Sequence, residues 1–220
     1  MQIEAVAYYK GALGSKFGVP RQSGLVPALE GQIVFEPKYR RSEAFRGLEG
    51  FSHLWLIWGF HANKGAKGEW QPTVRPPRLG GNAALGVWAT RSPFRPNPLG
   101  LSCVEILSID PENCILHVRG ADLMDGTPIY DVKPYVVYAD SIPGAVSGFA
   151  TEAPSPTLEV ELPESLPLQG QEREALQALL ALDPRPAYQD DAEKEYGLSY
   201  AGLDIKFRVQ GGRLTVLSYE

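Results

Sequence analysis

The stretch His53-Leu-Trp-Leu-Ile-Trp-Gly-Phe60 is apolar almost throughout. Such a run predicts a strand covered on both faces, because a half-exposed strand would alternate apolar and polar residues. Further short apolar or alternating runs lie on either side of it, at residues 3–9, 32–36, 84–90, 102–109, 115–118 and 130–138. Turn residues separate them, since the chain holds 23 glycines and 19 prolines. The pattern predicts a mainly β fold, a barrel or sandwich, over alternating α/β units.

The pattern of residue types along the chain changes after Ser141. We expect one domain over residues 1–148 and a smaller α+β domain over residues 149–220. In the second part, residues 158–162 predict an edge strand, residues 171–182 carry leucines at helical spacing, and residues 204–219 predict a hairpin around Gly211-Gly212. Residues 39–48 of the first part carry a weaker helical pattern.

The composition argues against membrane-spanning, secreted and disulfide-rich classes of protein. No apolar run approaches the ~18 residues of a membrane helix, and the first residues lack the pattern of a signal peptide. We therefore expect a cytoplasmic protein that does not enter a membrane. The two cysteines, Cys103 and Cys114, do not make a disulfide framework, and we expect buried thiols.

Charge is distributed unevenly along the chain. The net charge is −5, yet residues 1–140 hold 15 Lys and Arg against 13 Asp and Glu, while residues 141–220 hold 6 against 13. Residues 64–95 are strongly basic, with Lys64, Lys67, Arg75, Arg78, Arg91 and Arg95 against Glu69 alone. A local basic surface on an acidic protein suits a site for a chosen polyanion, although a solvated loop explains charge alone equally well.

Several familiar catalytic motifs are missing. No Gly-x-Gly-x-x-Gly follows a strand, and there is no Gly-x-Ser-x-Gly. The three histidines lie far apart and have no Cys or His at ligand spacing, so we expect no metal site.

Two proline-rich stretches carry most of the polar chemistry. They are Val74-Arg-Pro-Pro-Arg-Leu-Gly-Gly-Asn82 and the run from Gly86 to Leu101. Arg75 and Arg78 share a face of an extended proline segment, and prolines restrict the backbone around Arg91, Arg95 and Asn97. Arginines held in this way are suited to bidentate contacts with phosphate or carboxylate.

Other polar motifs follow predicted strands. Residues 16–22 supply Arg21 and Gln22 beside Pro20, and His61 follows Phe60 at the end of a strand. In residues 120–128, Asp122 and Asp125 are suited to accept hydrogen bonds from ribose hydroxyls, although Asp125-Gly126 also predicts a plain turn. Lys133 and Tyr135, in residues 131–135, share one face of a strand, and an ion pair is an alternative explanation for them.

These motifs, taken in order, resemble the TsaA-like, or TrmO, family of tRNA methyltransferases. The matching segments are KFGVPRQ, GFSHLWL with FH, VRPPRLGGN, GVWATRSPFRPNPLGLS, DLMDGTP, DVKPY and the later DPRPAY. The resemblance covers residues 1–140 closely and the remainder more weakly. Trp88, Leu99 and Met124 depart mildly from the residues usual in the family and leave the polar positions intact.

The resemblance implies a small β-barrel that binds S-adenosylmethionine, forms a homodimer, and methylates N6 of threonylcarbamoyl-adenosine at position 37 of tRNA. The cofactor residues that it implies are Pro20, Arg21, Gln22, Phe60, His61, Arg91, Leu101, Asp122, Leu123, Met124 and Asp125. The expected tRNA contacts are Arg75, Arg78, Arg95, Asn97, Lys133, Arg185 and Tyr188. His61 and Asp131 are candidates, by residue type, for the group that takes a proton from the target nitrogen.

Three alternatives remain open at this point. A non-catalytic RNA-binding protein would use the same basic surface. A hydrolase would employ Cys103, His61 and an aspartate. A methyltransferase of this family would act on another adenine or on a small molecule.

Overall fold

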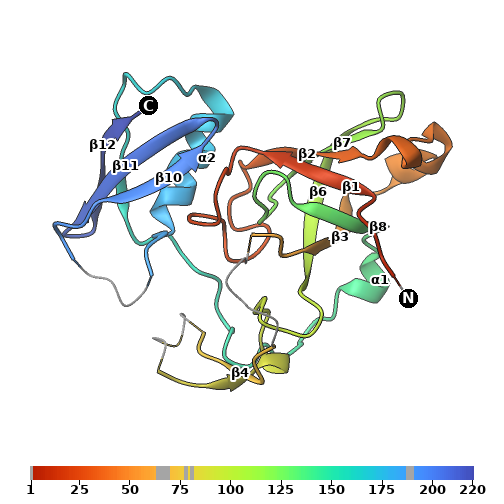
Figure 1. Ribbon diagram of the computed structural model, residues 1–220, viewed down its shortest axis with the longest axis horizontal. Coiled ribbons are helices and arrows are strands. Elements are labelled where there is room, and N and C mark those ends of the chain that lie inside the picture. The colour runs from red at the N-terminus through yellow and green to blue at the C-terminus, as the bar shows by residue number, and fades with distance from the viewer. Residues whose placement is uncertain (1, 63–69, 77–78, 80–81, 187–190) are drawn as a thin grey trace.

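The computed structural model describes residues 2–62, 70–76, 79, 82–186 and 191–220. Its two parts are a closed six-stranded barrel formed by the first part of the chain and a smaller sheet with one helix formed by the last part (Figure 1). The mainly β fold class, with a barrel followed by a smaller α+β unit, is thus confirmed. Arg78 and Tyr188, both expected to contact tRNA, lie outside the described residues.

The barrel closes in the order β1-β2-β7-β6-β3-β8, and every neighbouring pair is antiparallel. Its strands are β1 (Ala7–Gly11), β2 (Glu30–Phe35), β3 (His53–Gly59), β6 (Leu99–Asp110), β7 (Ile115–Arg119) and β8 (Pro128–Pro134). Strand β3 pairs with β6 on one side and β8 on the other, so the apolar run that begins at His53 lies inside the closed sheet. The barrel core contains side chains such as Tyr9, Leu56 and Ile129, which are almost fully buried.

The C-terminal part is a four-stranded sheet with one helix. The strand order is β10-β11-β12-β9, from β10 (Tyr196–Tyr200), β11 (Leu203–Gln210), β12 (Arg213–Tyr219) and β9 (Glu159–Glu161). Strand β9 lies at the edge of this sheet, as expected, and pairs in parallel with β12. Helix α2 (Gly170–Ala181) buries Leu176, Leu179 and Leu180 in the core of this unit.

An N-terminal segment contributes to that C-terminal core. Leu13, Val26 and Leu29 belong to the same buried cluster as the leucines of α2. The backbone of this segment also pairs with the free edge of β10, since the N–H of Gly14 donates to the carbonyl of Ser199 at 3.1 Å. The two parts of the chain are therefore joined by shared packing as well as by the connection after residue 141, in which the expected boundary at residue 148 lies.

Several local expectations were wrong. Of residues 84–90, only Leu85–Gly86 form a strand (β5), paired with β4 (Thr73–Val74), and Val87–Ala89 make a 3-10 turn instead. The Val87 N–H still donates to the Pro72 carbonyl at 3.0 Å, in register with the β4–β5 pair. The chain turns after this residue, since the Thr90 N–H donates back to the Val87 carbonyl at 3.1 Å.

The helix expected over residues 39–48 is also absent. Three 3-10 turns, Pro37–Tyr39, Ser42–Phe45 and Leu48–Gly50, replace it. Extended backbone at Arg40 and Arg41 separates the first two turns, and Gly47, with a φ of 87°, separates the second from the third. Strand β8 ends at Pro134, and the short helix α1 (Val137–Asp140) follows where the strand was expected to continue. Strand β10 was not predicted. No helix among the described residues is both long and apolar enough to cross a membrane.

Candidate functional site

A cavity of about 520 Å³ opens at the end of β3, between the barrel and the loops that leave it. Its volume falls within the roughly 300–1,000 Å³ typical of small-molecule sites. Segments far apart in the sequence line it: Lys16, Val19, Pro20, Arg21, Gln22, Trp58, Phe60, His61, Ala62, Thr90, Arg91, Pro93, Arg95, Asn97, Leu99, Gly100, Leu101, Asp122, Leu123, Met124 and Thr127.

The cavity gathers nearly all the residues that the sequence placed at a cofactor. Those lining it are Pro20, Arg21, Gln22, Phe60, His61, Arg91, Leu101, Asp122, Leu123 and Met124. Two of the expected tRNA contacts, Arg95 and Asn97, also lie there. Tight loop contacts bring these segments together: the Gly24 N–H donates to the Gly120 carbonyl at 2.8 Å, and a Cβ on Gly120 would lie only 3.5 Å from Gly24.

Asp125 does not line the cavity. Its carboxylate accepts a hydrogen bond from the Gly11 N–H at 3.2 Å and lies 3.8 Å from the Lys10 ammonium. It thereby joins the loop after β7 to the end of β1, whereas Asp122 of the same loop lines the cavity.

Other predicted residues lie elsewhere. Asp131 and Lys133 form an ion pair with each other at 2.8 Å on β8, away from the cavity lining. Arg75 is exposed in the segment after β4. Arg185 makes a two-pronged ion pair with Asp183, both contacts being 2.9 Å long. Of the two candidate proton acceptors, His61 and Asp131, only His61 is at the cavity.

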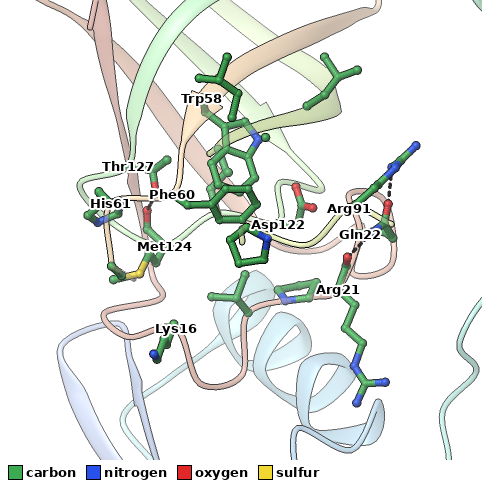
Figure 2. Close-up of a pocket in the computed structure, with 18 of the residues that line it drawn as sticks. Lys16, Arg21, Gln22, Trp58, Phe60, His61, Arg91, Asp122, Met124 and Thr127 are labelled. Carbon is green, nitrogen blue, oxygen red and sulfur yellow. Dashed lines mark hydrogen bonds between the residues drawn. The ribbon is translucent and has the colours of Figure 1, made fainter. Parts of the chain in front are cut away.

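Aromatic rings form one wall. Trp58 and Phe60 lie with ring centroids 4.4 Å apart and tilted by 59°. Trp58 is opposite Gly100 in the β3–β6 ladder, and a Cβ on Gly100 would approach the indole to 2.2 Å. Glycine at this position therefore admits the indole beside β6 and keeps Phe60 presented to the cavity (Figure 2).

A hydrogen-bonded chain fixes the acidic residue. The Trp58 Nε1–H donates to the Ser102 hydroxyl at 2.9 Å, and that hydroxyl donates to the Asp122 carboxylate. Burial raises the pKa of Asp122 above its usual value, against the lowering effects of the Ser102 hydrogen bond and the Arg91 charge. A carboxylate that pays a desolvation penalty is stabilised by a ligand that brings positive charge or hydroxyl donors.

Cationic side chains lie across the cavity from the aromatic wall. The Arg91 guanidinium donates a hydrogen bond to the Gln22 side-chain oxygen, although the two residues are far apart in the sequence. In Figure 2 the Arg21 side chain extends away from Phe60 and Asp122, so that Arg91 is the nearer guanidinium to the carboxylate. Arg91 is exposed and therefore available to an anionic group.

Sequence reasoning missed several parts of this site. Ser102 was assigned only to a strand, although it is 1% exposed and a buried hydroxyl requires a partner. Trp58 was expected only as a buried residue of a strand, and no role was predicted for Lys16 or Thr90. All three residues line the cavity. Nothing local to Ser102 indicates Asp122, because the contact depends on how the loop after β7 folds over β6.

The structure does not bring together the residues that the hydrolase alternative requires. Cys103 does not line the cavity that His61 lines, and burial raises the pKa of its thiol, which disfavours the nucleophilic thiolate. Among the described residues, no group of three or more His, Cys, Asp or Glu side chains is arranged to hold a metal ion.

Comparisons with known proteins agree with this geometry. The model of the tRNA-methyltransferase O N-terminal domain matches residues 8–141, and that of the TrmO C-terminal domain matches residues 155–220. The chain is 39% identical to a tRNA (adenine(37)-N6)-methyltransferase of Escherichia coli (strain K12), over 100% of this chain and 97% of the relative. A protein of the same name from Eikenella corrodens is 46% identical, over 74% of this chain and 93% of the relative.

A solved structure extends the likeness to the fold. The crystal structure of TrmO from Pseudomonas aeruginosa has a TM-score of 0.81 at 30% identity, covering 100% of this chain and 98% of that one. Both family models and the full-length relatives thus account for the barrel and the C-terminal unit together. The chain belongs to the TrmO family of tRNA methyltransferases.

Proposed function

We propose that this protein transfers a methyl group from S-adenosylmethionine to N6 of adenosine 37 in tRNA, with threonylcarbamoyl-adenosine as the substrate. The observation that carries the proposal is the convergence of Phe60, Arg91 and Asp122 on one cavity in a chain of this family. Each supplies a different kind of contact, and the cavity is large enough for a nucleoside ligand.

The cavity residues fit the chemical groups of this cofactor, which supplies an electrophilic methyl on a positively charged sulfur. Phe60 and Leu101 offer an aromatic and an apolar surface for the adenine. Asp122 is held by Ser102 and accepts the ribose hydroxyls, while Arg91 and Gln22 receive the carboxylate. The lowered hydration of Asp122 also favours a cationic ligand nearby.

In the transfer itself, a nitrogen–carbon bond forms at N6 as the carbon–sulfur bond breaks in line, and N6 loses its proton. Much of the rate enhancement comes from holding the two reacting atoms in line, which is a matter of alignment and electrostatics. His61 lines the cavity, and we assign to it the role of taking this proton. We propose this role for His61 and not for Asp131, which is paired with Lys133 outside the cavity.

Other residues of the proposal contact tRNA. Arg95 and Asn97 line the cavity on the side of the proline-rich loop and are placed for phosphate or for the threonine carboxylate. The remaining predicted contacts lie beyond the cavity lining or outside the described residues, and they stay predictions: Arg75, Arg78, Lys133, Arg185 and Tyr188.

A cytoplasmic homodimer completes the proposal. Val137, Tyr138, Ile142 and Val146 are between 70% and 93% exposed and follow one another along a short stretch of chain. Apolar side chains exposed together in this way support burial against a second copy. Sedimentation of the wild type and of Tyr138→Glu tests this point, since the charge is expected to shift the protein towards monomer.

The reaction is tested with purified protein, S-adenosylmethionine and two preparations of one tRNA, with and without the threonylcarbamoyl group. Mass spectrometry of the digested nucleosides is expected to show one added methyl on the hypermodified adenosine only. Methylation of unmodified adenosine 37 would assign the other adenine substrate. Retention of tRNA without any methyl transfer would assign a non-catalytic RNA-binding protein and contradict the proposal.

A further inference from the structure

Two exposed tryptophans form a stacked pair beside the cavity. The rings of Trp70 and Trp88 have centroids 5.9 Å apart and are inclined by 28°. Trp88 is 68% exposed and Trp70 is 46% exposed, so the pair presents a large aromatic surface to solvent. A soluble domain normally covers such rings, and we call this pair the tryptophan platform.

Backbone hydrogen bonds hold the platform in place. The Val87 N–H, next to Trp88, donates to the Pro72 carbonyl at 3.0 Å. The Gln71 N–H, next to Trp70, donates to the Phe94 carbonyl at 3.2 Å. Val87 itself is fully buried, so both tryptophans stand on anchored backbone, Trp70 just before β4 and Trp88 just after β5. Strand β4 lies apart from the barrel in Figure 1.

The platform is connected directly to the cavity. The Arg95 guanidinium carbon lies 5.7 Å from the centroid of the Trp88 ring, and Arg95 lines the cavity. Its Nη1 donates to the carbonyls of Thr90 at 3.1 Å and Ser92 at 3.3 Å, which fixes the side chain between the two features. An RNA that reaches Arg95 at the cavity therefore also comes close to the Trp88 ring.

The charge of the segment that carries the platform favours a polyanion. Residues 70–104 contain four arginines and no aspartate or glutamate, within a chain of net charge −5. Cationic side chains interleaved with exposed aromatic rings are the usual means of binding unpaired nucleic acid, because phosphates pair with the cations and bases stack on the rings.

We propose that Trp88, supported by Trp70, stacks on an unpaired base of the anticodon loop that flanks the target adenosine at the mouth of the cavity. This proposal rests on the proposed function for the identity of the RNA. Trp88 is thus a positioning residue: it holds the loop so that its neighbour nucleotide enters the cavity, while Arg95 spans the distance between them.

The test combines protein and RNA changes. Anticodon stem-loops are prepared with an abasic nucleotide at each loop position beside adenosine 37, and Kd is measured for the wild type, Trp88→Ala and Trp88→Phe. We expect Trp88→Ala to weaken binding of the intact loop roughly 5- to 100-fold and Trp88→Phe to weaken it much less. For the wild type, the abasic nucleotide at one of these positions is expected to raise Kd by a similar factor. For Trp88→Ala, the same abasic nucleotide is expected to leave Kd unchanged.

Phe51→Ala is the matched control. Phe51 is also an exposed aromatic residue, but it lies before the start of β3, whereas the cavity lies at the other end of that strand. This variant is expected to bind the loop as the wild type does. Affinity for S-adenosylmethionine is expected to stay unchanged in all of the variants, which separates loop positioning from damage to the cavity.

Tryptophan fluorescence gives a second measurement that needs no destabilising variant. Stacking of a base on Trp88 is expected to quench wild-type emission during titration with the intact loop, and Trp88→Phe is expected to lose most of that quenching. The proposal would be overturned if the abasic nucleotide raised Kd equally in the wild type and in Trp88→Ala. It would also be overturned if binding caused no quenching. A Trp88→Ala variant that changes only the oligomeric state in sedimentation would overturn it as well. Failure of the methyl transfer itself, with these binding results intact, would instead contradict the proposed function.

Discussion

The Ser102 hydroxyl donates a hydrogen bond to the Asp122 carboxylate, which joins the middle of β6 to the loop that follows β7. Trp58 donates to the same hydroxyl from β3. One buried serine thus couples the aromatic wall of the cavity to its acidic residue, and the cavity's two kinds of contact depend on each other.

Asp122→Asn is expected to have opposite effects on stability and on binding. Burial raises the pKa of Asp122, so between the unfolded and folded pKa values the folded state binds more protons. The stability of the unliganded protein therefore falls as pH rises through that window. The amide lacks this penalty, and its Tm at neutral pH should rise by a few degrees, whereas calorimetry should show weaker S-adenosylmethionine binding.

Asp125→Ala is the control for that variant. It removes a carboxylate that accepts from Gly11 and pairs with Lys10 away from the cavity. We expect lower stability, by about 1 kcal/mol, with little change in cofactor affinity. A loss of affinity in Asp125→Ala that exceeds the loss in Asp122→Asn would show that the wrong aspartate has been placed at the cofactor.

Cofactor affinity should also depend on pH. Protonated Asp122 neither attracts a cation nor accepts hydroxyl donors as well, so the wild-type affinity is expected to fall as pH is lowered through the raised pKa of this group. Calorimetry over a pH series checks this, and the slope should be largely absent in Asp122→Asn. The same slope in both proteins would place the titrating group elsewhere.

Ser102→Ala and Trp58→Phe should be coupled. Removing the hydroxyl leaves the indole N–H buried without its acceptor and is expected to cost about 1–3 kcal/mol of unfolding free energy. In the double variant no such donor remains, so the two costs should not add. Denaturant unfolding of all four proteins measures the coupling, and strict additivity would mean that the hydrogen bond contributes nothing.

Arg91→Ala should weaken S-adenosylmethionine binding roughly 10- to 100-fold, as expected for loss of a charge-assisted contact. Arg91 is exposed, so the melting temperature should hardly change. Arg21→Ala is the comparison, because its side chain extends away from Phe60 and Asp122 (Figure 2) and should matter less. Unchanged affinity on titration calorimetry of Arg91→Ala would remove this residue from the site.

Gly100→Ala should displace the indole of Trp58. The added methyl would lie 2.2 Å from the ring, and we expect a loss of about 1–3 kcal/mol or more together with weaker cofactor binding. Gly197→Ala in β10 adds the same methyl with nothing within 4 Å, and it should leave both properties nearly unchanged. Thermal unfolding and calorimetry of the pair distinguish a local clash from a general effect of alanine.

Most strands of the barrel, the helix at Gly170–Ala181 and the polar motifs can be predicted from the amino-acid sequence, because apolar pattern, turn residues and proline act over a few neighbouring positions. Strand β10 is an exception. Residues 84–90 are another, where β-branched and aromatic side chains suggested a strand although Val87 is buried in a turn.

Which motifs lie together becomes known from the folded chain. The tertiary structure separated Asp122 from Asp125, placed His61 but not Asp131 at the cavity, and put Leu13 into the core of the C-terminal unit. These outcomes depend on strand register and on loops that cross between distant strands. Such contacts follow from the closure of the whole barrel, and no local pattern of residues encodes them.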